Sequence, residues 1–149
     1  MPLSESPMGL ALVVCDTIIE DKTTGKKTLV GLFDRVQTLK LPCAHPAMSI
    51  LVTLTGGRGD YPAEVICRHT ETDEVTFSAK GKVTLRDPRQ VVDLVFRLNG
   101  VRFKHAGMHW VQFLADDMPI MMRPLFISLR EKGKDGKDEK KDEPGHIGN

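Results

Sequence analysis

The sequence predicts an all-β protein, an antiparallel β-sandwich of about eight strands. Three observations lead to this prediction. Apolar and polar residues alternate along many short segments, turn-forming residues recur about every dozen positions, and no segment has the apolar spacing of an amphipathic helix. A sandwich is favoured over a small barrel because the glycines that would form barrel corners do not recur along the chain.

The N-terminal half begins with a near-continuous apolar run, residues 9–20, which is typical of a central strand or one covered on both faces. Residues 21–27 contain the Thr and Gly of a hairpin loop, and the Val-, Leu- and Phe-rich residues 28–41 are expected to form the return strand. Residues 47–55 then alternate well, and a glycine cluster beginning at Gly56 ends that strand.

Strict alternation is clearest in residues 74–86, where Val, Phe, Ala, Gly and Leu take every second position between Thr, Ser, Lys and Arg. Successive side chains of a strand point to opposite faces, so this pattern predicts one buried and one solvated face. The shorter alternating segment 63–69 precedes it, across a polar turn at residues 69–73. Asp87 and Pro88 end the long strand.

The C-terminal half continues the pattern. Asn99–Gly100 is a strong turn dipeptide, and Asp116–Asp117 is expected to form a tight acidic turn. Pro124 cannot donate a ladder hydrogen bond, so it predicts an edge position or a bulge in the last strand. The strands expected here are residues 91–98, 107–115 and 120–129.

The two ends of the chain differ from this domain, which we place at residues 9–130. Residues 1–8 contain two prolines and are expected to form a short flexible arm. Residues 131–149 contain five Lys, six acidic residues and one aliphatic residue, Ile147. Such a segment buries too little apolar surface to offset its ordering entropy, so a disordered charged tail is predicted.

The composition argues against several classes of partner. The 149 residues carry 21 Lys and Arg against 20 Asp and Glu, a formal net charge of +1, so neither nucleic acid nor an anionic membrane is expected. No run approaches the roughly 18–20 apolar residues of a spanning helix, and the start lacks the basic residues of a secretory signal. The odd set Cys15, Cys43 and Cys67 suits reduced thiols, so a cytoplasmic location is expected.

Four segments carry a resemblance to a known family. They are VVCDTIIEDKTTGKKTLVGLFDRV near the start, the P-x-x-H-P of Pro42–Pro46, the GGRGDYP turn, and GMHWVQFLADDMPIMMRPLFISL near the end. Together they resemble a family of uncharacterised bacterial domains of unknown function, read as antiparallel β-sandwiches. The resemblance covers about residues 9–130. It implies the fold, and it implies no catalytic residue, because its motifs are hairpins, a Gly-led strand and an acidic turn.

Two Cys-x-His spacings, Cys43/His45 and Cys67/His69, are the main candidate for a metal or thiol site. Residues two apart on a strand point the same way, so two such pairs that meet would offer a Cys2His2 set to zinc. Structural zinc sites favour longer spacings, however, and Cys43 and His45 are expected in a loop between prolines. Cys67 lies on an apolar face, where a free cysteine is an ordinary core residue. The core interpretation is favoured and no metal or cofactor is expected, although the sequence leaves open whether the four residues converge.

Catalytic and nucleic-acid sites are not expected either. A Cys–His dyad would need an activated thiol and an oxyanion hole, and the adjacent Asp116–Asp117 are explained by a turn. We therefore expect no enzyme activity and no catalytic residues.

Arg58–Gly59–Asp60 matches an adhesion tripeptide, but a tight turn explains the same residues. Eight basic residues would form one cationic face if the two strands that carry them pair. Ordinary solvated strand faces are favoured over a nucleic-acid site, because few aromatics are available for base stacking. The eight residues are Lys80, Lys82, Arg86, Arg89, Arg97, Arg102, Lys104 and His105.

Trp110 is the single tryptophan. It suits either the centre of the core or a platform on which a ligand stacks, and Met108 and Gln112, two residues away on either side, do not decide between the faces. The core is favoured. Met118, Met121 and Met122 add a soft apolar stretch beside it, which fills gaps when buried and makes adaptable contacts when exposed.

Three functions are therefore ranked. The first is a non-enzymatic, immunoglobulin-like sandwich that contacts an unknown protein, or a second copy of itself, through open sheet edges. The second is a small-ligand or carbohydrate-binding module that uses Trp110 and the loop Gly56–Tyr61. The third is a metal or thiol site at Cys43, His45, Cys67 and His69.

Deletion of residues 131–149 should leave the melting temperature almost unchanged, because this segment adds little apolar surface to the core. Calorimetry of the full and truncated chains measures the difference. A large fall on truncation would show that the segment docks on the domain.

Overall fold

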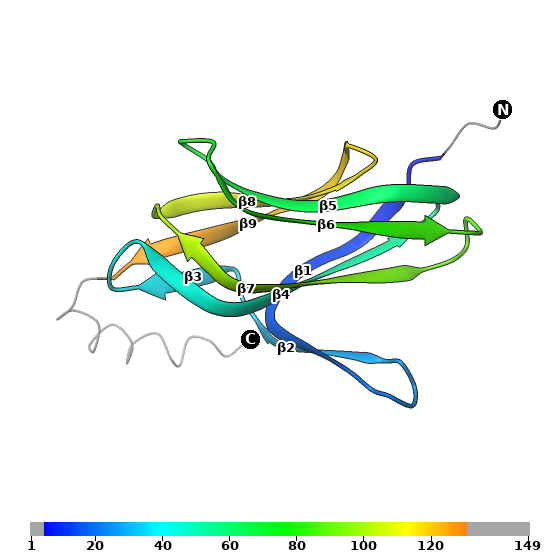
Figure 1. The fold of residues 1–149 in the computed structure, drawn as a ribbon, viewed down its shortest axis with the longest axis horizontal. Coiled ribbons are helices and arrows are strands. Elements are labelled where there is room, and N and C mark those ends of the chain that lie inside the picture. The colour runs from blue at the N-terminus through cyan, green and yellow to red at the C-terminus, as the bar shows by residue number, and fades with distance from the viewer. Residues whose placement is uncertain (1–4, 131–149) are drawn as a thin grey trace, which may run out of the picture.

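The computed structural model describes residues 5–130, which form nine strands in two facing sheets (Figure 1). The predicted all-β sandwich is confirmed, and no described residue is helical. The described part therefore has no helix long and apolar enough to cross a membrane. The arm is described from Glu5 onward, and the predicted tail at 131–149 lies outside the described residues.

Sheet A has four strands in the order β2-β1-β4-β7, and sheet B has five in the order β3-β9-β8-β5-β6. Neighbouring strands are antiparallel except for β3 and β9, which are parallel. The strands are β1 (Met8–Glu20), β2 (Lys27–Leu32), β3 (Arg35–Thr38), β4 (Cys43–Thr55), β5 (Gly59–His69), β6 (Val75–Leu85), β7 (Val92–Phe103), β8 (Gly107–Ala115) and β9 (Met118–Leu129).

The ninth strand arises because the segment expected as one strand, residues 28–41, is divided. Its first part is β2, which pairs with β1 in sheet A, and its second part is β3, which pairs with β9 in sheet B. The chain crosses between the sheets at Phe33 and Asp34. Phe33 packs against the core at this crossing, so its side chain points into the interior between the two sheets.

The turn expected at Asn99–Gly100 is wrong, because both residues lie inside β7. Gly100 has φ of 63°, a backbone conformation that glycine adopts at little cost. On one side of it the buried residue is Phe96, and on the other side the buried residues are Val101 and Phe103. The inward positions therefore change from even to odd numbers, and the strand continues with its register to β4 unbroken.

Strand β4, which pairs with β7, corrects a second expectation. Cys43 and His45 were expected in a loop, but both belong to β4, where they pair with Phe103 and Val101. The cis peptide bond between Leu41 and Pro42 directly precedes this strand. Cys43 and His45 are both partly buried, and Cys43 packs against the core.

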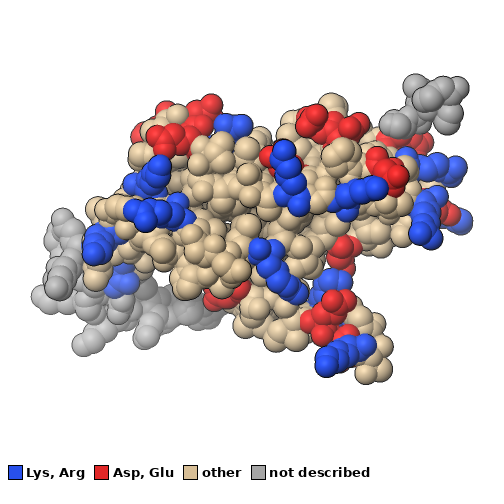
Figure 2. Space-filling model, viewed as in Figure 1, with Lys and Arg blue, Asp and Glu red and all other residues tan. Residues whose placement is uncertain are grey.

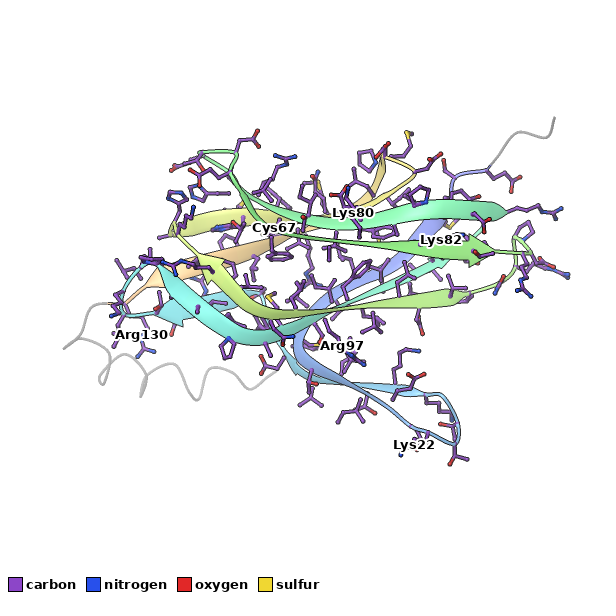
Figure 3. All side chains as sticks on the ribbon, in the orientation of Figure 1. Lys22, Cys67, Lys80, Lys82, Arg97 and Arg130 are labelled. Atoms are coloured by element: carbon purple, nitrogen blue, oxygen red, sulfur yellow. The ribbon has the colours of Figure 1, made fainter. Side chains whose placement is uncertain are left out.

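The core lies between the sheets, where the side chains from both inner faces interdigitate (Figure 3). Strand β6 confirms the predicted alternation at its ends, since Phe77, Val83 and Leu85 are buried. The largest side chains that are fully buried include Phe103, Phe113, Met48, Ile50, Leu54, Leu85, Leu125 and Ile127.

Two contacts close the sandwich along the side where β1 faces β9. The Nη1 of Arg123 in β9 donates a hydrogen bond of 2.7 Å to the backbone oxygen of Leu12 in β1. Nearby, Gly9 leaves the space that the side chain of Met121 occupies, so a larger residue there would displace the methionine. These contacts join the two sheets where no strand pairing does.

Pro124 fits its predicted edge position locally. Strand β9 lies between β3 and β8, but β3 pairs only with residues 126–129. At Pro124 the strand is therefore paired on one side alone, with Trp110 of β8. The amide hydrogen that proline lacks would have no partner strand on the other side, so its absence costs no hydrogen bond.

Truncation of Phe77 or Phe96 to Ala should lower the free energy of unfolding by about 3–5 kcal/mol, because both rings lie in the core. Chemical denaturation measures the change. Ser78→Ala is the matched control, since Ser78 is exposed on the other face of β6 and its loss should change stability by less than about 0.5 kcal/mol. A near-neutral Phe77→Ala would mean that the strand faces are inverted.

Candidate functional site

The candidate site is the outer face of sheet B, and β8 fixes it. The inward side chains of β8 are buried, with exposed fractions of 0% for His109, Val111 and Phe113. Because successive side chains of a strand point to opposite faces, Met108 and Trp110 point outward. Gln112 and Leu114 follow them along the same face, and all four are partly exposed.

The neighbouring strands extend this surface. Across from Trp110 lie Pro124 in β9 and Arg68 in β5. Met108 pairs with Phe126, and Gln112 lies between Met122 and Ile66. We call the resulting apolar surface the Trp110 face; it consists of Ile66, Met108, Trp110, Leu114, Met122, Pro124 and Phe126.

Charged residues border the Trp110 face on both sides. On the β3 side, the guanidinium of Arg35 lies 5.3 Å from the centroid of the Phe126 ring, and its Nη1 donates a 2.5 Å hydrogen bond to Ser128. On the opposite side, Arg68 and Glu64 project from β5, and Lys80 pairs with Glu64 across β6. The face therefore has an apolar centre and a polar border.

The position of Trp110 corrects the sequence interpretation, which favoured the core. His109 occupies the inward position, and Trp110 lies on the opposite face. The signal was present further along the strand: Val111, Phe113 and Ala115 define an inward set with odd numbers, which places Trp110 outward. A histidine at an inward position obscured that set, because histidine by itself favours neither face.

The loop Gly56–Tyr61 does not share a site with Trp110. Tyr61 pairs with Val83, while Trp110 pairs with Arg68 seven residues further along β5, which is about 23 Å at roughly 3.3 Å per residue. The Tyr61 hydroxyl accepts a hydrogen bond of 2.8 Å from the Arg58 amide and lies 2.5 Å from the Glu5 backbone oxygen. Tyr61 is 4% exposed, so it holds this loop together rather than offering a binding surface.

The four residues of the two Cys-x-His spacings do not form a common site. Cys43 and His45 belong to β4 of sheet A, and Cys67 and His69 belong to β5 of sheet B. Among residues 5–130, no group of three or more His, Cys, Asp or Glu side chains is arranged to hold a metal ion. His45 instead contacts the Phe33 ring, with 5.3 Å between ring centroids.

The thiols of the described residues are free, and two are shielded. Burial raises the pKa of Cys67 to about 12, and burial also raises the pKa of Cys15. A thiolate is the reactive form of cysteine, so these environments oppose nucleophilic chemistry.

The cationic residues named from the sequence do not form one continuous face. Lys80 and Lys82 lie on β6 of sheet B and Arg97 lies on β7 of sheet A, so the two strands face each other as edges of different sheets (Figure 3). In the view of Figure 2, basic and acidic side chains are interspersed over this side of the molecule.

Three histidines that the sequence did not connect meet at one end of sheet B. The ring of His69 stacks on His105 with 4.7 Å between centroids, and it lies 4.9 Å from the ring of His109. The pairing of His69 with His109 across β5 and β8 creates this contact. The contact depends on strand register, which no local pattern in either segment encodes.

The comparisons with known proteins add a family and a distant structural likeness. Residues 10–128 match the sequence pattern of a family described as "Family of unknown function (DUF6941)". No curated protein matches the chain. Similar solved structures include those of a β-glucosidase from Listeria innocua bound to isofagomine or to glucose, each with 11% identity and a TM-score of 0.49. Each match covers 87% of this chain and 17% of that enzyme, so the chain spans less than a fifth of the enzyme's length.

Cys67 should resist a small disulfide reagent at pH 8 in the native protein. With a pKa of about 12 its thiolate fraction there is on the order of one in ten thousand, and the side chain is fully buried. Mass spectrometry of labelled peptides measures the reaction at each cysteine, and all three should react in denaturant. Native labelling of Cys67 as fast as that of the partly buried Cys43 would contradict the assignment.

Proposed function

The chain belongs to this family of unknown function, and we propose that it is a non-enzymatic binding module that contacts another protein through the Trp110 face. The observation that carries the proposal is the chemistry of this face. Its centre presents a tryptophan, a phenylalanine and two methionines, with Arg35 and Arg68 at its border. Protein interfaces are enriched in aromatic residues, Met and Arg, and are depleted of Lys, Glu and Asp in their centres.

The geometry of the face also suits protein recognition. Its side chains stand on hydrogen-bonded strands, so little backbone conformational entropy is lost when a partner binds. Arg35 is held over Phe126 by the cation–π contact and by its bond to Ser128. A central Trp ringed by polar residues is the arrangement in which single side chains contribute most to binding energy.

The charges at the border are mixed. Arg35, Arg68 and Lys80 stand there with Glu64, with Asp73, whose carboxylate lies 4.0 Å from Arg68, and with Asp117, which lines a hollow together with Leu114 and Lys80. The expected partner therefore presents an apolar centre with a polar border that carries both signs of charge.

A cytoplasmic location is part of the proposal. Cys15, Cys43 and Cys67 are free thiols, and reducing compartments maintain free thiols.

Carbohydrate binding is the second candidate function. Trp110 is partly exposed and lies beside Gln112 and Arg68, so a sugar ring stacked on the indole would have hydrogen-bond donors at its edge. The large apolar area formed with Met108, Met122 and Phe126 favours a protein instead, because a sugar would leave most of it exposed.

Photo-crosslinking from position 112 should capture the proposed partner. With benzoylphenylalanine in place of Gln112, irradiation of the native host cells should give one discrete adduct with a second polypeptide. Adding Trp110→Ser to this chain should reduce the adduct at least tenfold, as loss of about 1.4 kcal/mol or more from a central residue would do. The same group at the exposed Thr28 in β2 is the matched control.

Three outcomes would reject protein contact at this face. They are no adduct from position 112, equal adducts from positions 28 and 112, and an adduct insensitive to Trp110→Ser. Quenching of Trp110 emission by an oligosaccharide, with no protein adduct, would support the second candidate. Melting of the Trp110→Ser protein should stay close to that of the parent, since the replaced side chain lies outside the core.

A further inference from the structure

The three histidines at the end of sheet B join the turn that follows β5 to the loop that precedes β8. His69 ends β5, His105 lies in the loop between β7 and β8, and His109 follows in β8. His69 and His109 are 4% and 0% exposed, and the rings of His109 and Phe103 lie nearly perpendicular with 5.8 Å between centroids. We call these three residues the histidine cluster.

The hydrogen bonds place one proton on each of the two buried rings. The Nε2 of His69 is 3.0 Å from the Ala106 backbone oxygen and must donate to it, while its Nδ1 lies 2.9 Å from the Thr72 hydroxyl and 3.3 Å from the Thr72 amide. The Nδ1 of His109 donates to the Gly107 oxygen at 3.2 Å. Its Nε2 is therefore an unprotonated acceptor, and it is buried without a hydrogen-bond partner among the described residues. The His109 ring is uncharged in this arrangement.

A second proton on His109 has no favourable place. Its surroundings are His69 from β5, Phe103 from β7 and Leu125 from β9, which pairs with it. The carboxylate that contacts the cluster, Glu74, reaches the outer ring instead, 3.3 Å from the Nε2 of His105. Burial lowers the pKa of His109, and the charges of His69 and His105 lower it further, while the bond to Gly107 opposes them.

The histidine cluster and the Trp110 face are built on adjacent residue pairs of β5 and β8, on opposite sides of sheet B. His69 pairs with His109 on the inner side, and the adjacent residues Arg68 and Trp110 pair on the outer side. The Thr70 amide also donates to the Met108 oxygen at 3.0 Å. Separation of the histidine rings would therefore move the start of β8, which carries the aromatic centre of the face.

We propose that the histidine cluster is an acid-released latch that holds the Trp110 face in its binding form at neutral pH and opens when His109 takes up a proton. Opening separates the turn at residues 70–74 from the loop at residues 104–106, which the bonds of His69 join in the closed form. That opening releases a partner rests on the proposed function; the opening itself is a property of the chain.

The direction of the pH dependence follows from linkage. The opened form has His109 near its ordinary pKa of about 6.5, above its pKa in the closed form, so the opened form binds more protons at acid pH. The latch is therefore fully closed above about pH 6.5 and loses stability as the pH falls through the lower, closed-form value. The population of the opened form rises by up to about tenfold per pH unit for each proton taken up.

Hydrogen exchange of the full chain between pH 8 and pH 5 tests the latch. After correction for the intrinsic effect of pH, exchange at residues 107–111 should rise up to about tenfold per unit below about pH 6.5. Trp110 emission should shift over the same range, and since it is the single tryptophan it reports this strand directly. His109→Leu should abolish both responses, and His109→Gln provides a polar variant that does not titrate if the leucine chain fails to fold.

His45→Gln is the matched control, because His45 lies in sheet A against Phe33 and Asp16 and should leave both responses intact. A flat exchange profile in the parent chain, or the same pH response in a folded His109 variant, would overturn the proposal. The test needs no partner, so the latch and the proposed function fail separately. Crosslinking at pH 7.5 addresses the function, and exchange in the isolated protein addresses the latch.

Discussion

Strand β8 is the constraint on which the rest of the structure depends. It pairs with β5 on one side and β9 on the other, and its side chains alternate between the core and the Trp110 face. A shift of one residue would place Val111 and Phe113 in solvent and Met108 and Trp110 in the core. The apolar free energy that fixes the core therefore also fixes which residues the protein presents outward.

The same strand carries the weak point of the sheet. His109 takes an inward position beside fully buried apolar residues, with one ring nitrogen bonded and the other without a partner in the described residues. An unsatisfied buried acceptor costs about 1–3 kcal/mol. This end of sheet B is therefore expected to open more readily than its centre, where Val65 and Phe113 pack. The outward neighbour of this weak point is Trp110, which couples local stability to the proposed binding surface.

The crossing of the chain between the sheets serves the same surface. At Phe33 and Asp34 the chain leaves sheet A, and β3 then lies parallel to the end of β9. This places Arg35 over Phe126 and gives the apolar face its cationic border on that side. Arg123, from the inner side of β9, meanwhile joins the two sheets through Leu12. Strand β9 thus links the closure of the sandwich to the composition of the face.

The sequence by itself determined the class of fold, most of the strands and the acidic turn between β8 and β9, because side-chain alternation and turn chemistry are local properties. It did not determine the break at Phe33, the continuation of β7 through Gly100, or the contact of His69 with His109. Each of these depends on which strands become neighbours and in what register, which is decided by burial summed over the whole core. Trp110 lies between the two cases: its neighbours at 111, 113 and 115 encode its face, but an inward histidine hides the pattern until the tertiary structure shows what surrounds it.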